Sequence, residues 1–182
     1  MDKKFVITEK INIILKSKMC TVYKLSKLAG VDDSALYQMV KGDIPFSEDY
    51  RDKVLPILEV PKEEFESWIV ADKYPKEIIE RAIQVRKDFP YKRKRILTTK
   101  IDALLDERGL SRKAFAEQVI NYEQSSFNQI VVGKRNMSPA VREKVSVALE
   151  IPQEEILAWI MADRHGLAVL EQALKEIIEG EI

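Results

Sequence analysis

Apolar residues recur along the chain at intervals of three and four, the spacing that gathers side chains on one face of an α-helix. The spacing appears near the N-terminus and again ninety positions later, at two sets of residues: Ile7, Ile11, Ile14 and Leu15, then Leu97, Ile101, Leu104 and Leu105. No stretch alternates apolar and polar residues for long enough to predict a β-strand. The pattern therefore predicts an all-α fold.

The second half of the chain repeats the first. Residues 42–72 align with residues 133–163 at an offset of 91, and 14 of these 31 positions are identical. Closer to the N-terminus the offset is 90, so one extra residue lies in the second copy between positions 111 and 124. Repetition of this length predicts two domains of one fold. We expect a first domain over 1–72, a connecting helix and basic linker over 73–95, a second domain over 96–163 and a C-terminal amphipathic helix over 164–182.

Each copy is predicted to contain five helices, whose starts and ends are marked by capping residues. In the first copy, Thr21 caps a short second helix, a third helix ends at Gly42, and Pro61 opens the fifth. Ser111, Gly133 and Pro152 have the same roles in the second copy. The third and fourth helices are expected over about 33–40 and 47–58, and again over about 124–132 and 138–149. Within the second helices, the residues expected to face the core are Leu25 with Leu28, and Phe115 with Val119.

One more amphipathic stretch follows each five-helix copy. Its apolar residues are Ile78, Ile79, Ala82, Ile83 and Val85 after the first copy, and Leu167, Val169, Leu170, Ala173, Leu174, Ile177 and Ile178 after the second. A stripe of this kind covers its own domain, packs against the other copy or forms a dimer. We favour dimerisation through the C-terminal helix.

The turn between the second and third helices carries a motif. In the first copy it consists of Thr21, Leu25, Ser26, Gly30, Val31, Ser34, Leu36 and Gly42. The second copy matches at Ser111, Phe115, Ala116, Ser125, Phe127 and Gly133, with Asn121 in place of the turn glycine. This pattern resembles the Cro/repressor-type (XRE-like) helix-turn-helix family. The resemblance implies two lambda-repressor-like helix-turn-helix domains, each followed by its amphipathic helix.

In that family the third helix lies in the major groove of double-stranded DNA, and its outward residues contact bases. The resemblance therefore implies DNA contacts from Ser34, Tyr37, Gln38 and Lys41 in the first copy, and from Gln124, Ser125, Ser126, Asn128 and Gln129 in the second. Arg112, Lys113, Lys134 and Arg135 surround the second reading surface, whereas Asp32, Asp33 and Asp43 surround the first. Because phosphates repel carboxylates, we expect the second copy to be the stronger DNA binder.

Charge is distributed unevenly along the chain. With 30 basic and 30 acidic residues the formal net charge is zero, which argues against non-specific coating of nucleic acid. By segment, however, the net charge is −2 over 1–72, +6 over 73–95 and −4 over 96–182. The positive charge is concentrated at Lys92, Arg93, Lys94 and Arg95, directly before the second domain. This run is either a solvated linker or an arm that contacts phosphates.

Composition excludes several other classes of protein. One histidine and one cysteine cannot form a Cys/His zinc site, and the six glycines fit no nucleotide-binding loop. We therefore expect no enzyme activity and no cofactor. The chain shows neither a membrane-spanning run nor a signal peptide, so a cytoplasmic protein is expected, encoded by a bacterium or a phage as is typical of the family it resembles.

The sequence thus predicts a DNA-binding transcriptional regulator, most simply a repressor of the phage or mobile-element type that acts as a homodimer. A second hypothesis assigns the helix-turn-helix scaffold to a protein partner, as in antirepressors or anti-CRISPR-like inhibitors, with DNA binding kept for autoregulation. Its support is the acidic first copy and the overall neutrality of the chain.

Overall fold

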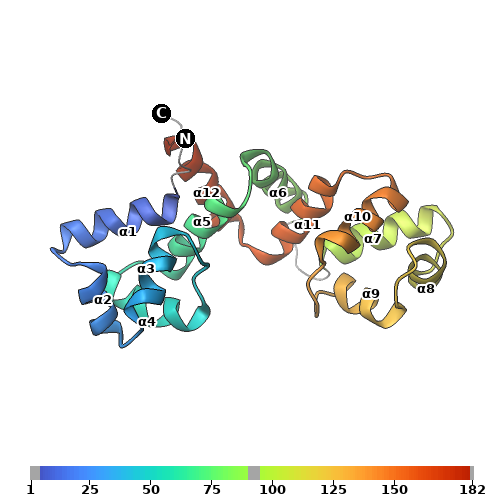
Figure 1. Cartoon of the computed structure of the whole chain (residues 1–182). Helices are drawn as coiled ribbons and strands as arrows, with labels where there is room; N and C mark the ends of the chain where they lie inside the picture. Colours follow the sequence, from blue (N-terminus) through green and yellow to red (C-terminus); the bar gives the residue numbers. More distant parts are fainter. Residues whose placement is uncertain (1–4, 90–94, 181–182) are drawn as a thin grey trace. The chain divides into compact units, whose positions relative to one another are not determined.

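The computed structural model describes residues 5–89 and 95–180, which fold into helices joined by short connections (Figure 1). No strand occurs in these two stretches, so the all-α prediction is confirmed. The described residues form two compact units. Unit 1 comprises those up to Lys76 together with those from Ala168 onward, and unit 2 comprises Glu77–Leu167.

Unit 1 consists of five successive helices and one helix from the far end of the sequence. The successive helices are α1 (Val6–Ser17), α2 (Val22–Ala29), α3 (Asp33–Lys41), α4 (Glu48–Leu58) and α5 (Lys62–Lys73), and the distant one is α12 (Leu167–Gly180). Leu25, Leu36 and Val54 are completely buried in its core. On α5, the rings of Phe65 and Trp68 pack with their centroids 5.6 Å apart.

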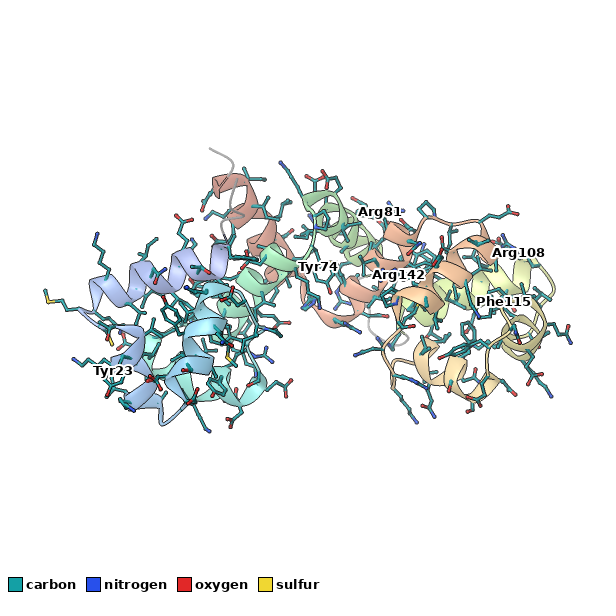
Figure 2. All side chains as sticks on the ribbon, viewed as in Figure 1. Tyr23, Tyr74, Arg81, Arg108, Phe115 and Arg142 are labelled. Carbon is teal, nitrogen blue, oxygen red and sulfur yellow. The ribbon has the colours of Figure 1, made fainter. Side chains whose placement is uncertain are left out.

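Unit 2 has the same order of elements. It contains α7 (Ile96–Glu107), α8 (Arg112–Ala114), the π-helical turn η1 (Phe115–Val119), α9 (Gln124–Val131), α10 (Pro139–Leu149), α11 (Gln153–Arg164) and the helix α6 (Lys76–Asp88). Phe115 and Phe127 are completely buried, with ring centroids 5.5 Å apart. Figure 2 shows Phe115 in the interior of this unit.

The helix ends follow the capping residues of the sequence. The hydroxyl of Thr21 accepts the N–H of Lys24 at 3.1 Å, and that of Ser111 accepts the N–H of Ala114 at 3.1 Å. Gly42, which ends α3, has φ 84°, and a Cβ there would lie 2.9 Å from the ring of Phe5. This position therefore needs glycine both for its left-handed backbone and for the close ring.

In each unit, an aspartate near the end of the fifth helix binds the start of the first helix. The carboxylate of Asp72 accepts the N–H groups of Val6 and Ile7, at 2.6 and 3.1 Å. In unit 2, Asp163 does the same for Ile96 and Leu97, at 2.8 and 3.0 Å. Since the first N–H groups of a helix have no partner within it, these carboxylates satisfy the start of α1 and of α7 and complement the helix dipole.

The two trailing helices are exchanged between the halves of the sequence. α12 follows the second repeat but belongs to unit 1, where Val169, Leu170 and Ala173 are buried. There the buried carboxylate of Glu176 pairs with Lys10 of α1 at 2.6 Å. Conversely, α6 follows the first repeat but belongs to unit 2. Of the three arrangements that the sequence allowed, the structure therefore has each helix packing on the other copy.

Two residues expected in the core lie at the surface. Leu28 is 60% exposed and its counterpart Val119 is 46% exposed. The buried face of α2 is set by Leu25 and Ser26, and Leu28 lies two residues beyond Ser26, about 200° around the helix. The prediction that Leu28 and Val119 face the core is therefore wrong.

Candidate nucleic-acid interface

In unit 1, α2 and α3 are joined by a tight turn whose backbone is fixed at three points (Figure 1). Gly30 has the left-handed conformation φ 63°, ψ 38°, which glycine adopts without steric cost. The N–H of Val31 donates to the Ser26 carbonyl at 3.0 Å. The carboxylate of Asp32 then caps α3 by accepting the N–H of Ala35 at 2.8 Å. The direction of α3 relative to α2 is thereby set by local contacts.

Unit 2 forms the same turn with one residue more. The N–H of Tyr122 donates to the Ala116 carbonyl at 2.8 Å, six residues back, where the equivalent bond in unit 1 spans five. The π-helical turn η1 takes up the extra residue, and within it the N–H of Ile120 reaches the Phe115 carbonyl at 3.1 Å. Asn121, with φ 45°, replaces Gly30 as the left-handed residue. Despite the inserted residue, the turn before α9 therefore keeps both features of the turn in unit 1. These are a hydrogen bond back to the preceding helix and one residue in the left-handed conformation.

The inner faces of α3 and α9 anchor these helices in equivalent ways. Leu36 and Phe127 are each completely buried. At the far end, the hydroxyl of Thr8 donates to the Val40 carbonyl at 2.6 Å, and that of Thr98 donates to the Val131 carbonyl at 2.8 Å. Each helix is thus fastened to the first helix of its unit, which leaves its outer face for other contacts.

The outer faces carry the residues that the sequence assigned to DNA. Ser34, Tyr37, Gln38 and Lys41 are all exposed on α3, and Ser125 and Gln129 are exposed on α9. Gln124, Ser126 and Asn128 are half-buried. Each helix therefore brings its predicted residues together on one polar surface, which we call the reading surface of that unit.

Aromatic side chains distinguish the reading surface of unit 1. The ammonium of Lys41 lies over the ring of Tyr37, 4.7 Å from its centroid. On α2, Lys27 lies 5.1 Å from the ring centroid of Tyr23, which is 61% exposed (Figure 2). Tyr23 was not a predicted site residue; it lies two residues before the buried Leu25, about 200° around α2, and is exposed beside the turn that leads to α3.

Some of the predicted basic residues of unit 2 already form hydrogen bonds with side chains of the protein. The guanidinium of Arg112 donates two hydrogen bonds to Asp102, both at 2.6 Å, which raises the pKa of Arg112. Asp102 was not a predicted site residue, and its ten-residue separation from Arg112 gives no helical-pair signal. Arg135 donates to the hydroxyl of Ser126 at 3.1 Å, while Lys113 and Lys134 are exposed.

The basic run directly before α7 is described only at its last residue. Arg95 contacts the carboxylate of Asp163 at 3.4 Å and donates to the Val132 carbonyl at 3.2 Å. Its guanidinium covers Gly133 so closely that a Cβ on this glycine would overlap it. Arg95 therefore joins the start of α7 to the end of α9. The other predicted residues of the run, Lys92, Arg93 and Lys94, lie outside the described residues.

A carboxylate caps the reading helix of unit 2. Glu123 accepts the N–H of Ser125 at 3.0 Å and that of Ser126 at 2.8 Å. Hydrogen bonding with Ser125 and Ser126 lowers the pKa of Glu123 to about 2. In unit 1, Asp32, Asp33 and Asp43 are exposed around α3. Asp32 caps α3 as Glu123 caps α9, and Asp33 and Asp43 are further exposed carboxylates close to α3 in the sequence.

The described stretches of the chain lack two other kinds of feature. They contain no group of three or more side chains placed to hold a metal ion, and no helix that is both long and apolar enough to cross a membrane. Comparison with models of known protein families, with curated proteins and with solved structures gives no match.

Proposed function

We propose that this protein binds double-stranded DNA with sequence selectivity and regulates transcription. The observation that carries the proposal is the pair of reading surfaces: a polar outer face on α3 and on α9, each placed by a capped turn and fastened by a buried inner face. The major groove of B-DNA admits one α-helix, and helices presented in this way are a common means of reading it.

The side chains on these surfaces suit base recognition. Glutamine and asparagine amides pair bidentately with adenine, and serine hydroxyls bond to several bases. Gln129, Asn128 and Ser125 supply these groups on α9, and Gln38 and Ser34 supply them on α3. Adenine-containing sites are therefore the expected targets of both surfaces.

Phosphate contacts are assigned to cations near unit 2. Lys113 and Lys134 are exposed, and Lys92, Arg93 and Lys94 precede α7 in the sequence. Such contacts position a protein on the duplex and make its affinity fall with added salt. Bound at a promoter, a protein of this kind represses by excluding the polymerase, as do the phage and mobile-element repressors that the sequence resembles.

A gel-shift experiment tests the proposal. The double substitution Asn128→Ala with Gln129→Ala should abolish preference for a selected duplex over random DNA while residual non-specific binding remains. Gln84→Ala provides the control, because Gln84 is an exposed glutamine of unit 2 on a different helix, α6. Unchanged preference in the double variant would remove α9 from the recognition of DNA.

One observation favours a second candidate, binding of a protein partner by unit 1. Ile13, Met19, Tyr23 and Leu28 are between 58% and 91% exposed. Exposed tyrosine and apolar side chains are typical of the centres of protein interfaces. The full chain separates the two functions: retention on DNA at low salt supports DNA binding, and absence of retention favours the protein partner. Isolated repeats are unsuitable for this experiment, because each repeat would lack the trailing helix that it receives from the other half of the sequence.

A further inference from the structure

The two reading surfaces are similar but not identical. Residues of α3 correspond to residues of α9 at an offset of 91. Two outward positions hold the same residue in both helices, namely Ser34 with Ser125 and Gln38 with Gln129. Four positions of these surfaces differ, namely Asp33 with Gln124, Ala35 with Ser126, Tyr37 with Asn128 and Lys41 with Val132. One chain therefore carries two related surfaces with a shared part and a distinct part.

The apolar faces that a homodimer would need are used within the chain. Val169, Leu170 and Ala173 of α12 are buried in unit 1, where Gln172 also donates to the buried Glu176 at 2.6 Å. In unit 2, Arg81 of α6 donates to Glu155 at 2.9 Å. The same carboxylate accepts the indole N–H of Trp159 at 2.7 Å. Each repeat thus receives from the other the trailing helix that a separate subunit would otherwise supply.

On these grounds, and resting on the DNA-binding function proposed above, we infer that a single chain reads an asymmetric DNA site composed of two unlike half-sites. α9 contacts one half-site and α3 contacts the other. A repressor with one reading helix needs two chains to occupy two half-sites, and its site is then symmetric. Here the chain supplies both helices, so symmetry of the site is not required.

The matched residues specify how the half-sites resemble each other. Gln38 and Gln129 are exposed at the same position, so each half-site contains an adenine read by a glutamine amide. Ser34 and Ser125 lie one helical turn before them, on the same face. The half-sites therefore share the bases that face this pair of positions.

The unmatched residues specify how the half-sites differ. Asn128 favours a second adenine in the half-site of unit 2. At the same position unit 1 has Tyr37, and Lys41 lies over its ring. A tyrosine ring suits contact with a thymine methyl, and a lysine suits guanine or a phosphate. Asp33 accepts a hydrogen bond from a cytosine amino group, whereas Gln124 favours adenine.

Selection of bound duplexes from a random pool, carried out with the full chain, tests this inference. Wild-type protein should enrich two half-sites that share one adenine and differ elsewhere, and native mass spectrometry should show one chain per duplex. The substitutions Asp33→Gln, Ala35→Ser, Tyr37→Asn and Lys41→Val give the reading surface of unit 1 the residues of unit 2. This variant should enrich a site with two identical halves of the unit 2 type.

The reciprocal variant provides the matched control. The substitutions Gln124→Asp, Ser126→Ala, Asn128→Tyr and Val132→Lys should duplicate the half-site of unit 1 instead. All eight positions are exposed or half-buried, so both variants should keep the helical circular dichroism and melting temperature of the wild type. Should one of them fail to fold, the stoichiometry and the other variant still decide the question.

The outcomes that contradict the two-half-site inference differ from those that contradict DNA binding itself. Two chains per duplex, enrichment of a single half-site, or an unchanged site with both variants would overturn the inference and leave DNA binding intact. Absence of any enrichment by the wild-type chain would remove the proposed function and the inference together.

Discussion

Arg112 shows how a residue that the sequence assigns to DNA can already have a partner inside the protein. Its guanidinium is held bidentately by Asp102, and 27% of its side chain is exposed. Paired donors on a planar guanidinium match a carboxylate as well as they match a phosphate. Lys113, the next residue, is exposed. We therefore assign the phosphate contact at the start of α8 to Lys113.

Two alanine variants test that assignment. Lys113→Ala should lower the affinity for any duplex severalfold and reduce the slope of log affinity against log salt by about 1, because one phosphate contact is lost. Arg112→Ala should change affinity by less than about threefold, since Asp102 already occupies its donors. Fluorescence anisotropy at several salt concentrations measures both. Equal effects of the two substitutions would show that Arg112 leaves Asp102 to bind DNA.

Glu123 provides a prediction about pH. Its folded-state pKa of about 2 lies below the ordinary value of 4.5, so its contribution to stability is complete above about pH 4.5 and disappears as the pH falls towards 2. Glu123→Gln removes this titration. Thermal melts should therefore show the wild type more stable than the variant at pH 7, with a difference that shrinks between pH 4.5 and 2. A difference independent of pH in that range would contradict the capping role.

At the scale of elements, the π-helical turn η1 is where the two repeats diverge. Unit 1 makes the same turn after a regular helix, and its span from the N-cap Thr21 to the left-handed Gly30 is one residue shorter than the span from Ser111 to Asn121. Deletion of the exposed Gln118 should therefore convert η1 into an α-helix and change the free energy of unfolding by about 1 kcal/mol or less. Urea titration followed by circular dichroism measures the change.

A matched deletion controls for the effect of shortening a helix. Removing Lys27, which is also exposed on α2, leaves unit 1 one residue short between Ser26 and the turn and shifts the completely buried Leu36 relative to the core. It should cost about 3 kcal/mol or more, as truncations in a packed core do. If both deletions proved equally destabilising, the packing of unit 2 would depend on its extra residue, and η1 would not simply absorb an insertion.

Much of the element structure was predictable from the sequence, because helix ends depend on local chemistry. Thr21, Ser111 and Gly42 act on backbone groups within a few residues, and each marks the helix end expected of it. The position of Leu28 was not predictable from spacing alone, since α2 is short, only one of its two leucines is buried, and its other buried residue is a serine. The insertion was visible in the sequence as a change of offset, but its form as a π-turn depends on hydrogen bonds that no residue type specifies.

At the scale of the whole molecule, the exchange of trailing helices is the feature that sequence reasoning left open. An apolar stripe such as Val169, Leu170 and Ala173 is the same whichever surface it covers, so its periodicity does not identify the unit on which the helix packs. In the structure, one specific contact of α12 with unit 1 is the ion pair between Glu176 and Lys10, two residues that are far apart in the sequence. The candidate reading surfaces were predictable because they lie within one repeat.

Truncation at Gly166 tests the exchange. Burial of Val169 and Leu170 contributes about 1.5–3 kcal/mol each, so removal of α12 should destabilise unit 1, at the opposite end of the sequence. Hydrogen exchange followed by mass spectrometry should show α1 losing protection while α7 retains it. The reverse pattern, with α7 losing protection, would place α12 on its own repeat.

The central claim is that α3 and α9 contact DNA. The most direct measurement is the shift of backbone amide NMR signals when the full chain is titrated with a duplex recovered from a random pool. We predict that the largest shifts fall on Ser34–Lys41 and Gln124–Gln129, with little change on α4 and α10. Shifts that spare both of these segments, or that are confined to the exposed surface of Tyr23 and Leu28, would contradict the account.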